Sequence, residues 1–275
     1  MDSPDTLNDQ VSDRDFIQSI ERGFAVLTAF DADLPRPTLA EIAKKTRLSR
    51  PAVRRILLTL QQLGYVAGAD GRWTLTPRVL SIGQHYTASH ALIEIAQPHM
   101  AALAERTSEP ASLAALDGME VVHIADVPVR RIMSVNVSVG MRTPAYPTSM
   151  GRVLLAWRGP AAIDDYLAAI TFQAFTPRTV TSPQAFRDIL DQVRKDGYSI
   201  IDEELEEGLL SVSAPVFNAD GEVIAALASW TSKGRSTVAQ YRKTVVPHVV
   251  ELAAAISRDM GYGATPLRSR ASTRA

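Results

Sequence analysis

The chain has 275 residues, of which 46% are hydrophobic, and its formal net charge is −1 at pH 7. This length suits one large or two ordinary domains, and the absence of cysteine excludes disulfides, thiolate metal sites and cysteine nucleophiles. Because no apolar run approaches the ~18 residues of a membrane span and no signal peptide opens the chain, we expect a soluble, cytoplasmic protein with no membrane partner.

The polar and acidic composition of residues 1–15 is typical of disorder. A helix is predicted next, from Phe16 to Phe30, because apolar residues recur at helical spacing. We expect its apolar face to pack behind the two helices that follow. The residues of this face are Ile17, Ile20, Phe24, Leu27 and Phe30.

Two short helices joined by a tight turn are predicted between Thr38 and Leu63. Thr38 is a good N-cap for the first helix, and Glu41 three residues later completes a capping box. Arg47 begins the turn, and Ser49 is the expected N-cap of the second helix. The apolar residues of the second helix are expected to face a core, and they are Val53, Ile56, Leu57, Leu60 and Leu63.

A β-hairpin is predicted directly afterwards, because Asp70-Gly71 between short apolar runs is a strong hairpin signal. Two helices followed by a hairpin form a winged helix-turn-helix, whose second helix enters the major groove of double-stranded DNA. Residues 36–78 contain nine Lys or Arg and two acidic residues, a charge of +7, which leaves −8 for the rest of the chain. This concentration favours nucleic-acid binding, although a solvated basic helix face is the alternative. The expected DNA contacts are Thr38, Arg47, Ser49, Arg50, Arg54, Arg55 and Arg72.

The chain is predicted to contain a winged domain over residues 16–76, a linker helix over 77–95 and an α+β domain over 96–260. A disordered basic tail is expected over 261–275. In the α+β domain a loop is expected to become a helix between Thr148 and Trp157. The other predicted helices are 160–170, 183–195 and 238–260, and the predicted strands are 111–116, 120–127, 132–139, 198–202, 209–216 and 222–231.

Four segments in this order resemble the IclR family of bacterial transcriptional regulators, over essentially all of residues 16–260. They are SIERGFAVLTAF, TLAEIAKKTRLSRPAVRRILLTLQQLGYV, PTSMGRVLLA and DEELEEGLLSVSAPVFNADGEVIAALA. Within the family, VNVSVGMRTPAYPTSMGRVLLA is most similar to regulators of protocatechuate and 4-hydroxybenzoate breakdown, in the β-ketoadipate pathway.

The resemblance implies a GAF-like effector-binding domain after the winged domain, assembly into homodimers or tetramers, and a palindromic operator. It also implies that a small organic acid controls promoter occupancy, with protocatechuate, 4-hydroxybenzoate or β-ketoadipate as the expected effector. A regulator of another carboxylic-acid pathway, with an effector like glyoxylate or pyruvate, is the alternative. By position in the family, the effector site would include Ser149, Met150, Gly151, Leu209, Ser211 and Ser229.

The segment from Ser149 to Gly151 lies where a loop is predicted to meet a helix. Backbone N–H groups at a helix start have no intrahelical acceptor and favour an anion such as a carboxylate. Arg142 precedes this segment and is a candidate for a bidentate bond to the carboxylate, with Arg130 and Arg131 as alternatives. Helix capping, turns and strand surfaces are the alternative roles for the serines.

An acidic cluster begins at the end of the predicted strand 198–202 and consists of Asp202, Glu203, Glu204, Glu206 and Glu207. Paired carboxylates are typical of acid–base catalysis. We prefer a solvated or interdomain acidic loop, since nothing nearby resembles a nucleophile with its base.

No histidines have metal-ligand spacing and no phosphate-binding glycine loop occurs, so neither metal nor cofactor is expected. We interpret the chain as a regulator rather than an enzyme. An enzyme with an accessory DNA-binding domain is one alternative, and a regulator whose second domain only oligomerises is another.

Overall fold

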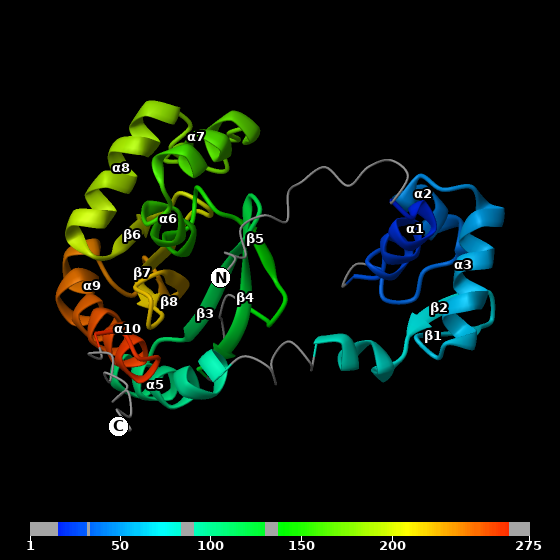
Figure 1. The fold of residues 1–275 in the computed structure, drawn as a ribbon, viewed down its shortest axis with the longest axis horizontal. Helices are drawn as coiled ribbons and strands as arrows, with labels where there is room; N and C mark the ends of the chain where they lie inside the picture. Colours follow the sequence, from blue (N-terminus) through cyan, green and yellow to red (C-terminus); the bar gives the residue numbers. More distant parts are fainter. Residues whose placement is uncertain (1–15, 32–33, 84–90, 130–136, 264–275) are drawn as a thin grey trace, which may run out of the picture. The chain divides into compact units, whose positions relative to one another are not determined.

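The computed structural model describes four stretches of the chain, residues 16–31, 34–83, 91–129 and 137–263. The chain divides into two compact units, Met1–Ser89 and His90–Ala275, and both are drawn in Figure 1. Several expectations lie outside the described residues: disorder over 1–15 and after residue 263, the middle of the linker helix, and most of the strand at 132–139. The domain boundaries predicted from the sequence therefore stay predictions.

The first unit, within its described residues, has α-helices and an antiparallel two-stranded hairpin. This is the winged helix-turn-helix predicted from the sequence. Its elements are α1 (Gln18–Leu27), α2 (Leu39–Thr46), α3 (Arg50–Gln62), β1 (Val66–Ala69) and β2 (Arg72–Leu75), followed by the 3-10 helix η1 (Pro77–Val79).

Local hydrogen bonds explain where α2 and α3 begin. The Thr38 backbone N–H donates to Glu41 Oε2 at 2.7 Å and the Glu41 N–H donates to Thr38 Oγ1 at 3.3 Å, which confirms the predicted capping box. Ser49 Oγ accepts from the Ala52 N–H at 3.4 Å, so Ser49 caps α3 as predicted. Arg47 ends α2 in the left-handed region, at φ 56°, and this turns the chain toward α3.

The apolar face of α1 differs from the prediction. Val26 and Ala29 pack into the core of the first unit. Ile17, Ile20 and Phe24 are instead exposed, with 58%, 54% and 56% of their surface accessible. The prediction that these three pack behind the next two helices is wrong, because α1 turns another face to that core. The predicted residues that do contact it are Leu27 and Phe30.

The second unit, within its described residues, is a six-stranded antiparallel sheet with helices on both faces. The strand order is β5-β4-β3-β8-β7-β6. Figure 1 shows α6, α7 and α8 on one side of the sheet, and α5, α9 and α10 on the other. The strands are β3 (Ala111–Asp117), β4 (Glu120–Val127), β5 (Arg142–Pro144), β6 (Ser199–Asp202), β7 (Leu209–Phe217) and β8 (Val223–Ser232). The helices are α5 (Ala91–Thr107), α6 (Ser149–Ala156), α7 (Pro160–Ala169), α8 (Pro183–Asp196), α9 (Val238–Thr244) and α10 (Val246–Asp259).

Alternation along the strands separates two faces of this sheet. On β8, Ala226 and Ala228 pack in the same core as α6 and α8, whereas Leu227 between them packs in the core that contains α5 and α10. We call these sides the α6 face and the α10 face. The register between strands then assigns each polar side chain of the sheet to one face or the other.

Two elements of the second unit differ from the prediction. β5 forms in a segment for which no strand was predicted, and it pairs with β4 as an edge strand. The single helix expected over residues 238–260 is two helices, because Pro247 lies in the first turn of α10 and has no N–H to continue α9. The other predicted elements within the described residues match to within a few positions. No described helix is both long and apolar enough to cross a membrane.

Candidate functional site

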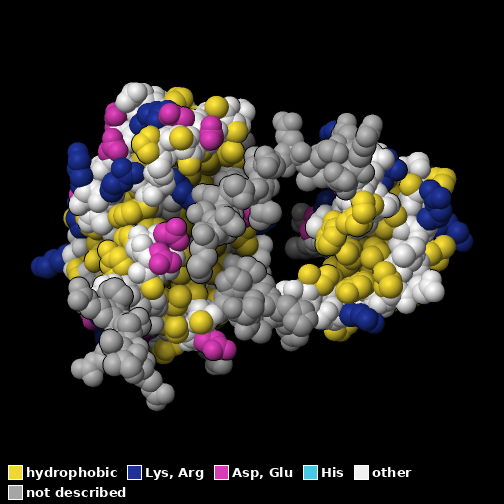
Figure 2. Space-filling model, viewed as in Figure 1, with side chains coloured by type: hydrophobic (Ala, Val, Ile, Leu, Met, Phe, Trp, Pro, Cys, Tyr) yellow, Lys and Arg dark blue, Asp and Glu magenta, His cyan; other side chains and the backbone are white. Residues whose placement is uncertain are grey.

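Helix α3 presents a basic surface. Arg50, Arg54 and Arg55 are exposed on it, and Arg47 is exposed just before it. Within the described part of the chain none of these four forms an ion pair. Figure 2 shows Lys and Arg side chains gathered at the side of the first unit where α3 lies. Because residues 50 and 54 are one turn apart, they project from the same side of the helix near its start, where they can reach a groove together.

The hairpin is joined to the start of α2. The Arg72 Nη1 donates to the Arg36 carbonyl oxygen at 2.8 Å, and the Trp73 N–H donates to the Pro37 carbonyl oxygen at 2.9 Å. Arg72 is exposed on the hairpin and lies opposite Thr38 at the start of α2. The Thr38 hydroxyl is already engaged in the capping box, so a phosphate contact from Thr38 would have to share it.

Three serine hydroxyls meet on the α6 face of the second unit. Ser149 Oγ, at the first residue of α6, lies 3.0 Å from Ser211 Oγ and 2.8 Å from Ser213 Oγ, both on β7. Thr148 caps the helix, since its Oγ1 accepts from the Gly151 N–H at 3.0 Å. The N–H groups of Ser149 and Met150 precede the first intrahelical bond and are suited to an anion. We call Ser149, Ser211 and Ser213 the serine cluster.

Gly151 allows the start of α6 to pack closely against the chain before it. A Cβ atom at this position would lie 2.0 Å from the Ala145 carbonyl oxygen and 2.4 Å from its carbonyl carbon. Both atoms belong to the backbone, so they cannot move aside as a flexible side chain can. The role of Gly151 that follows directly from the contacts is therefore this close approach, which fixes the helix start in place.

Arg152 was missed by the sequence reasoning, although it lies one turn after Ser149. Its side chain is 4% exposed and its Nη2 lies 2.5 Å from Glu204 Oε2, while its Nε donates to the Tyr146 carbonyl oxygen at 3.1 Å. Burial lowers the pKa of Arg152, and the carboxylate of Glu204 opposes that change. The helix start thus has a buried, paired positive charge nearby. The available signal was the i, i+3 spacing from Ser149.

The other residues predicted for the effector site are divided by the sheet. Leu209 has the same parity as Ser211 and shares the α6 face. Ser229 is directly opposite Val212, which belongs to the core on the α10 face, so Ser229 points away from the serine cluster. Its neighbour Trp230 is opposite Ser211, so the side chain of Trp230 lies on the α6 face. Sequence position alone did not show that Trp230, rather than Ser229, faces the serine cluster.

Arg142 lies on β5, and three strands separate β5 from the β7 strand of the serine cluster. Its guanidinium lies 2.8 Å from Asp117 and 2.6 Å from Glu120. Hydrogen bonds raise the pKa of Arg142, and the bond to Glu120 contributes more than the bond to Asp117. The structure therefore does not bring Arg142 and the serines together. The alternatives Arg130 and Arg131 lie outside the described residues.

A second polar group on the α6 face was also missed. Ser112 Oγ lies 2.7 Å from His123 Nδ1 and donates to the Ala125 carbonyl oxygen at 3.0 Å. Asp126 is directly opposite Ser112 in the β3–β4 pair. Burial lowers the pKa of His123 to about 4 and raises the pKa of Asp126 to about 6. The available signal was the presence of His123 and Asp126 in the otherwise apolar run VVHIADV.

The acidic cluster forms structural ion pairs. Glu203 Oε2 lies 2.5 Å from Lys233 Nζ, and this hydrogen bond is the main reason that the pKa of Glu203 is lowered. Asp202 pairs with Lys233 and Arg178. The expected solvated loop is wrong for Glu204, whose side chain is 12% exposed and paired with Arg152. Among the described residues, no three His, Asp or Glu side chains are grouped to hold a metal ion.

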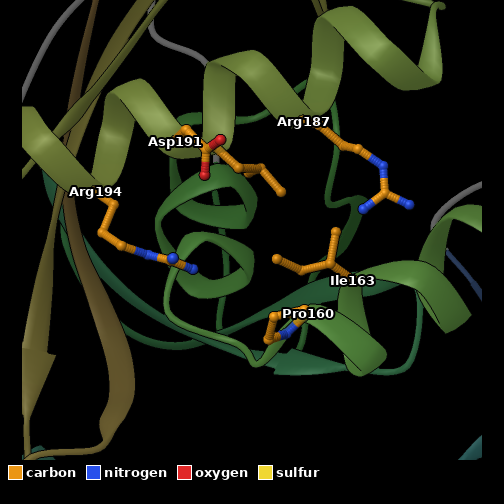
Figure 3. Close-up of a pocket in the computed structure, with 6 residues that line it drawn as sticks. Pro160, Ile163, Arg187, Asp191 and Arg194 are labelled. Carbon is orange, nitrogen blue, oxygen red and sulfur yellow. The ribbon is translucent and has the colours of Figure 1, made fainter.

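A small pocket lies between α7 and α8, and Figure 3 shows its lining. Arg187 pairs with Asp164, and the Arg194 Nε donates to the Ala156 carbonyl oxygen at 2.6 Å, so both arginines already have partners. None of the predicted site residues lines this pocket. The lining residues are Pro160, Ile163, Arg187, Leu190, Asp191 and Arg194.

Both units resemble known proteins. Residues 19–69 match the IclR helix-turn-helix domain, and residues 84–258 match the C-terminal domain of the bacterial transcriptional regulator IclR. The Pca regulon regulatory protein of Pseudomonas putida is 40% identical over 250 residues, which cover 90% of this chain and 84% of that protein.

Two further relatives are named for 4-hydroxybenzoate. The p-hydroxybenzoate hydroxylase transcriptional activator of Acinetobacter baylyi is 35% identical over 225 residues, which cover 80% of this chain and 83% of that protein. A solved IclR homologue from Microbacterium hydrocarbonoxydans, complexed with 4-hydroxybenzoate, is 26% identical with a TM-score of 0.77. The match covers 88% of this chain and 98% of that one.

Proposed function

Because the chain belongs to the IclR family of bacterial transcriptional regulators, we propose that it binds a promoter in the cytoplasm and that a small aromatic acid controls its occupancy there. The effector we propose is of the protocatechuate and 4-hydroxybenzoate class. The observation that carries this proposal is the serine cluster at the start of α6, together with the 4-hydroxybenzoate named for a related solved structure.

On DNA, α3 enters the major groove. Arg50 and Arg54 contact base edges, with Ser49 and Arg55 beside them, while Arg47 contacts a phosphate and Arg72 adds a contact from the wing. The guanidinium groups of α3 are exposed and form no ion pair with any described residue, which supports this assignment. Base contacts would supply specificity, and phosphate contacts would supply affinity that falls with salt.

In the effector unit, the carboxylate accepts hydrogen bonds from the N–H groups of Ser149 and Met150 and from the serine cluster. The buried charge of Arg152 adds a favourable potential, although its pairing with Glu204 reduces it. Leu209 and Trp230 supply apolar surface on the same face. Because its side chain belongs to the opposite face, Ser229 is not part of the proposed site.

We further propose that a second copy of the chain covers the exposed face of α1, giving a homodimer or a pair of dimers on a palindromic operator. Phe16, Ile17, Ile20 and Phe24 are each more than half exposed, at the spacing of one helix face. Figure 2 shows hydrophobic side chains gathered where α1 lies. An apolar patch of this kind is uncommon on a monomer, and a palindrome requires two symmetric winged helices.

The effector acts by favouring one arrangement of the two winged helices, through the segment 77–95 that joins the units. Coupling between two binding sites is reciprocal, so operator DNA must change effector affinity by the same factor as effector changes operator affinity. An equal effector affinity with and without operator would contradict this mechanism. Turnover lost in Glu203→Gln would instead support the enzyme alternative.

The test is a thermal-shift screen of the full chain with protocatechuate, 4-hydroxybenzoate, benzoate, β-ketoadipate, glyoxylate and pyruvate. A ligand at about 100 times its Kd should add ~2.7 kcal/mol to native-state stability. We expect shifts with the aromatic acids, reduced in Ser149→Ala and retained in the matched control Ser236→Ala, whose hydroxyl lies outside the serine cluster. A shift with glyoxylate or pyruvate alone would assign the chain to another carboxylic-acid pathway, and no shift at all would contradict effector control.

A further inference from the structure

One row of residues crosses four adjacent strands on the α6 face. Ser213 on β7 is opposite Ala228 on β8, Ala228 is opposite Ser112 on β3, and Ser112 is opposite Asp126 on β4. Residues directly opposite in antiparallel strands project from the same face. The row therefore has a member of the serine cluster at one end, a small apolar side chain next to it, and polar side chains at the other end.

The polar end of this row has hydrogen-bonding capacity that the described protein does not use. Asp126 Oδ1 is buried and, within the described residues, has no hydrogen-bond partner. The pKa of Asp126, raised to about 6 by burial, is still below neutral pH, so the carboxylate is mostly charged and is a strong acceptor. A buried acceptor without a donor is costly, so a ligand that brings a donor to it gains affinity.

Next to Asp126 in the row, Ser112 is hydrogen-bonded to a histidine. Ser112 Oγ lies 2.7 Å from His123 Nδ1, and both side chains are almost fully buried. Burial keeps His123 neutral near pH 7, because its pKa is lowered to about 4. The Ser112 hydroxyl donates to the Ala125 carbonyl oxygen, so Nδ1 of the neutral imidazole donates to Ser112 Oγ and Nε2 is an acceptor. The Ser112–His123 pair and Asp126 therefore both suit a ligand hydroxyl that donates.

The length of the row fits one aromatic ring with a polar group at each end. Adjacent strands lie about 4.8 Å apart, so Ser213 and Asp126, three strands apart, are separated by roughly 14 Å along the sheet. A hydroxybenzoate that makes a hydrogen bond of about 2.8 Å at each end has a comparable length. Ala228 is the apolar member of the row and packs in the core that contains α6, so it is the side chain suited to contact the ring.

We propose that Asp126 and the Ser112–His123 pair bind the ring hydroxyl groups of the aromatic acid whose carboxylate lies at the serine cluster. This inference rests on the proposed function and makes it more specific. The para hydroxyl donates to Asp126, and a neighbouring meta hydroxyl bonds to the Ser112–His123 pair. A hydroxylated benzoate is thereby distinguished from benzoate itself.

Charge gives the ligand a single orientation. The carboxylate of Asp126 repels the carboxylate of the effector, whereas the first turn of α6 attracts it. Benzoate leaves Asp126 without a donor, and a site built to bind a hydroxyl rejects an analogue that lacks it. The expected order of affinity is therefore hydroxylated acids first and benzoate last.

Isothermal titration calorimetry of the full chain with benzoate, 4-hydroxybenzoate and protocatechuate tests this inference. In Asp126→Ala we expect the two hydroxylated acids to bind about 10- to 100-fold more weakly, the loss typical of a hydrogen bond to a charged group, while benzoate binds as well as before or more tightly. Ser112→Ala should weaken protocatechuate more than 4-hydroxybenzoate. Asp220→Asn, in an exposed turn, is the control and should change nothing.

The outcomes separate this inference from the function on which it rests. Ser149→Ala should weaken all three acids by a similar factor, because it acts at the carboxylate. If the acids bind the wild-type chain but Asp126→Ala and Ser112→Ala weaken all three equally, or none, the hydroxyl site is wrong and the proposed function stands. If none of the three binds the wild-type chain, the proposed function fails and the hydroxyl site fails with it.

Discussion

Ser149 Oγ lies 2.8 Å from Ser213 Oγ, so the first residue of α6 is hydrogen-bonded to the middle of β7 inside the second unit. Both residues are almost fully buried. Replacing Ser213 with Ala leaves the Ser149 hydroxyl with fewer partners in a dry environment, which should lower the free energy of unfolding by about 1–3 kcal/mol. Urea unfolding of the full chain measures this change. An unchanged midpoint in Ser213→Ala would show that the bond contributes nothing to stability.

Gly151→Ala should be among the most destabilising single changes in the chain. The new Cβ would lie 2.0 Å from the Ala145 carbonyl oxygen, and relief requires a backbone shift at the start of α6. Overpacking of this kind costs about 1–3 kcal/mol, and here more because the contact is with backbone. Thermal unfolding followed by circular dichroism would report the loss.

The control for that change is Gly159→Ala. Gly159 has φ −63° and nothing within 4 Å of an added Cβ, so the alanine fits without strain. Its cost as the N-cap of α7 should stay below about 1 kcal/mol. Equal effects of the two substitutions would contradict the close approach of Gly151 and Ala145.

Glu204→Gln should destabilise the second unit, because it leaves the guanidinium of Arg152 buried without its counter-charge. Breaking a buried ion pair from one side costs about 3–5 kcal/mol, whereas replacing both partners with apolar residues is often tolerated. We therefore expect urea unfolding to show a large loss in Glu204→Gln and a partial recovery in the double variant Arg152→Met with Glu204→Leu. Additive losses in the double variant would contradict the pairing.

Most of the fold follows from local patterns in the sequence. The capping box of Thr38 and Glu41 is complete within four residues, and the Asp70-Gly71 turn has both residues at positive φ, 52° and 73°. Such signals need no knowledge of distant parts of the chain. The segment 238–260 was predicted as one helix, whereas Pro247 begins a second one.

The candidate site was only partly predictable because it depends on long-range register. Ser149 and Ser211 were predicted together from the family resemblance, and they do meet. Ser213 and Asp126 were missed, because only the pairing of β7, β8, β3 and β4 shows that their side chains share a face. The exposed side of α1 was misassigned for a similar reason. Periodicity identifies the apolar positions of a helix but not which of them a distant core will cover.

The pH dependence of stability should change in His123→Gln. The pKa of His123 is about 4 in the folded chain and ~6.5 when unfolded. Only the unfolded state binds the proton between these values, so His123 lowers stability as pH falls from about 6.5 to 4, by about 3 kcal/mol in total. The raised pKa of Asp126 acts in the opposite direction over about pH 6 to 3.8, because there the folded state binds the proton first.

The difference between wild-type and His123→Gln curves removes the contribution of Asp126, which both proteins share. Urea midpoints measured from pH 7.5 to pH 4.5 should fall more steeply for the wild type than for the variant. Parallel curves would show that His123 is not buried in its neutral form.

The assignment of α3 as the recognition helix predicts different effects for different arginines. Arg54→Ala should weaken binding to a promoter fragment by about 1–3 kcal/mol and reduce the preference over a scrambled fragment, because it removes a base contact. Arg47→Ala should weaken both fragments alike and reduce the slope of log affinity against log salt by about one, because it removes a phosphate contact. Arg242→Ala, exposed on α9, is the control. Fluorescence anisotropy across a salt series measures all three, and unchanged promoter affinity in Arg54→Ala would contradict the helix assignment itself.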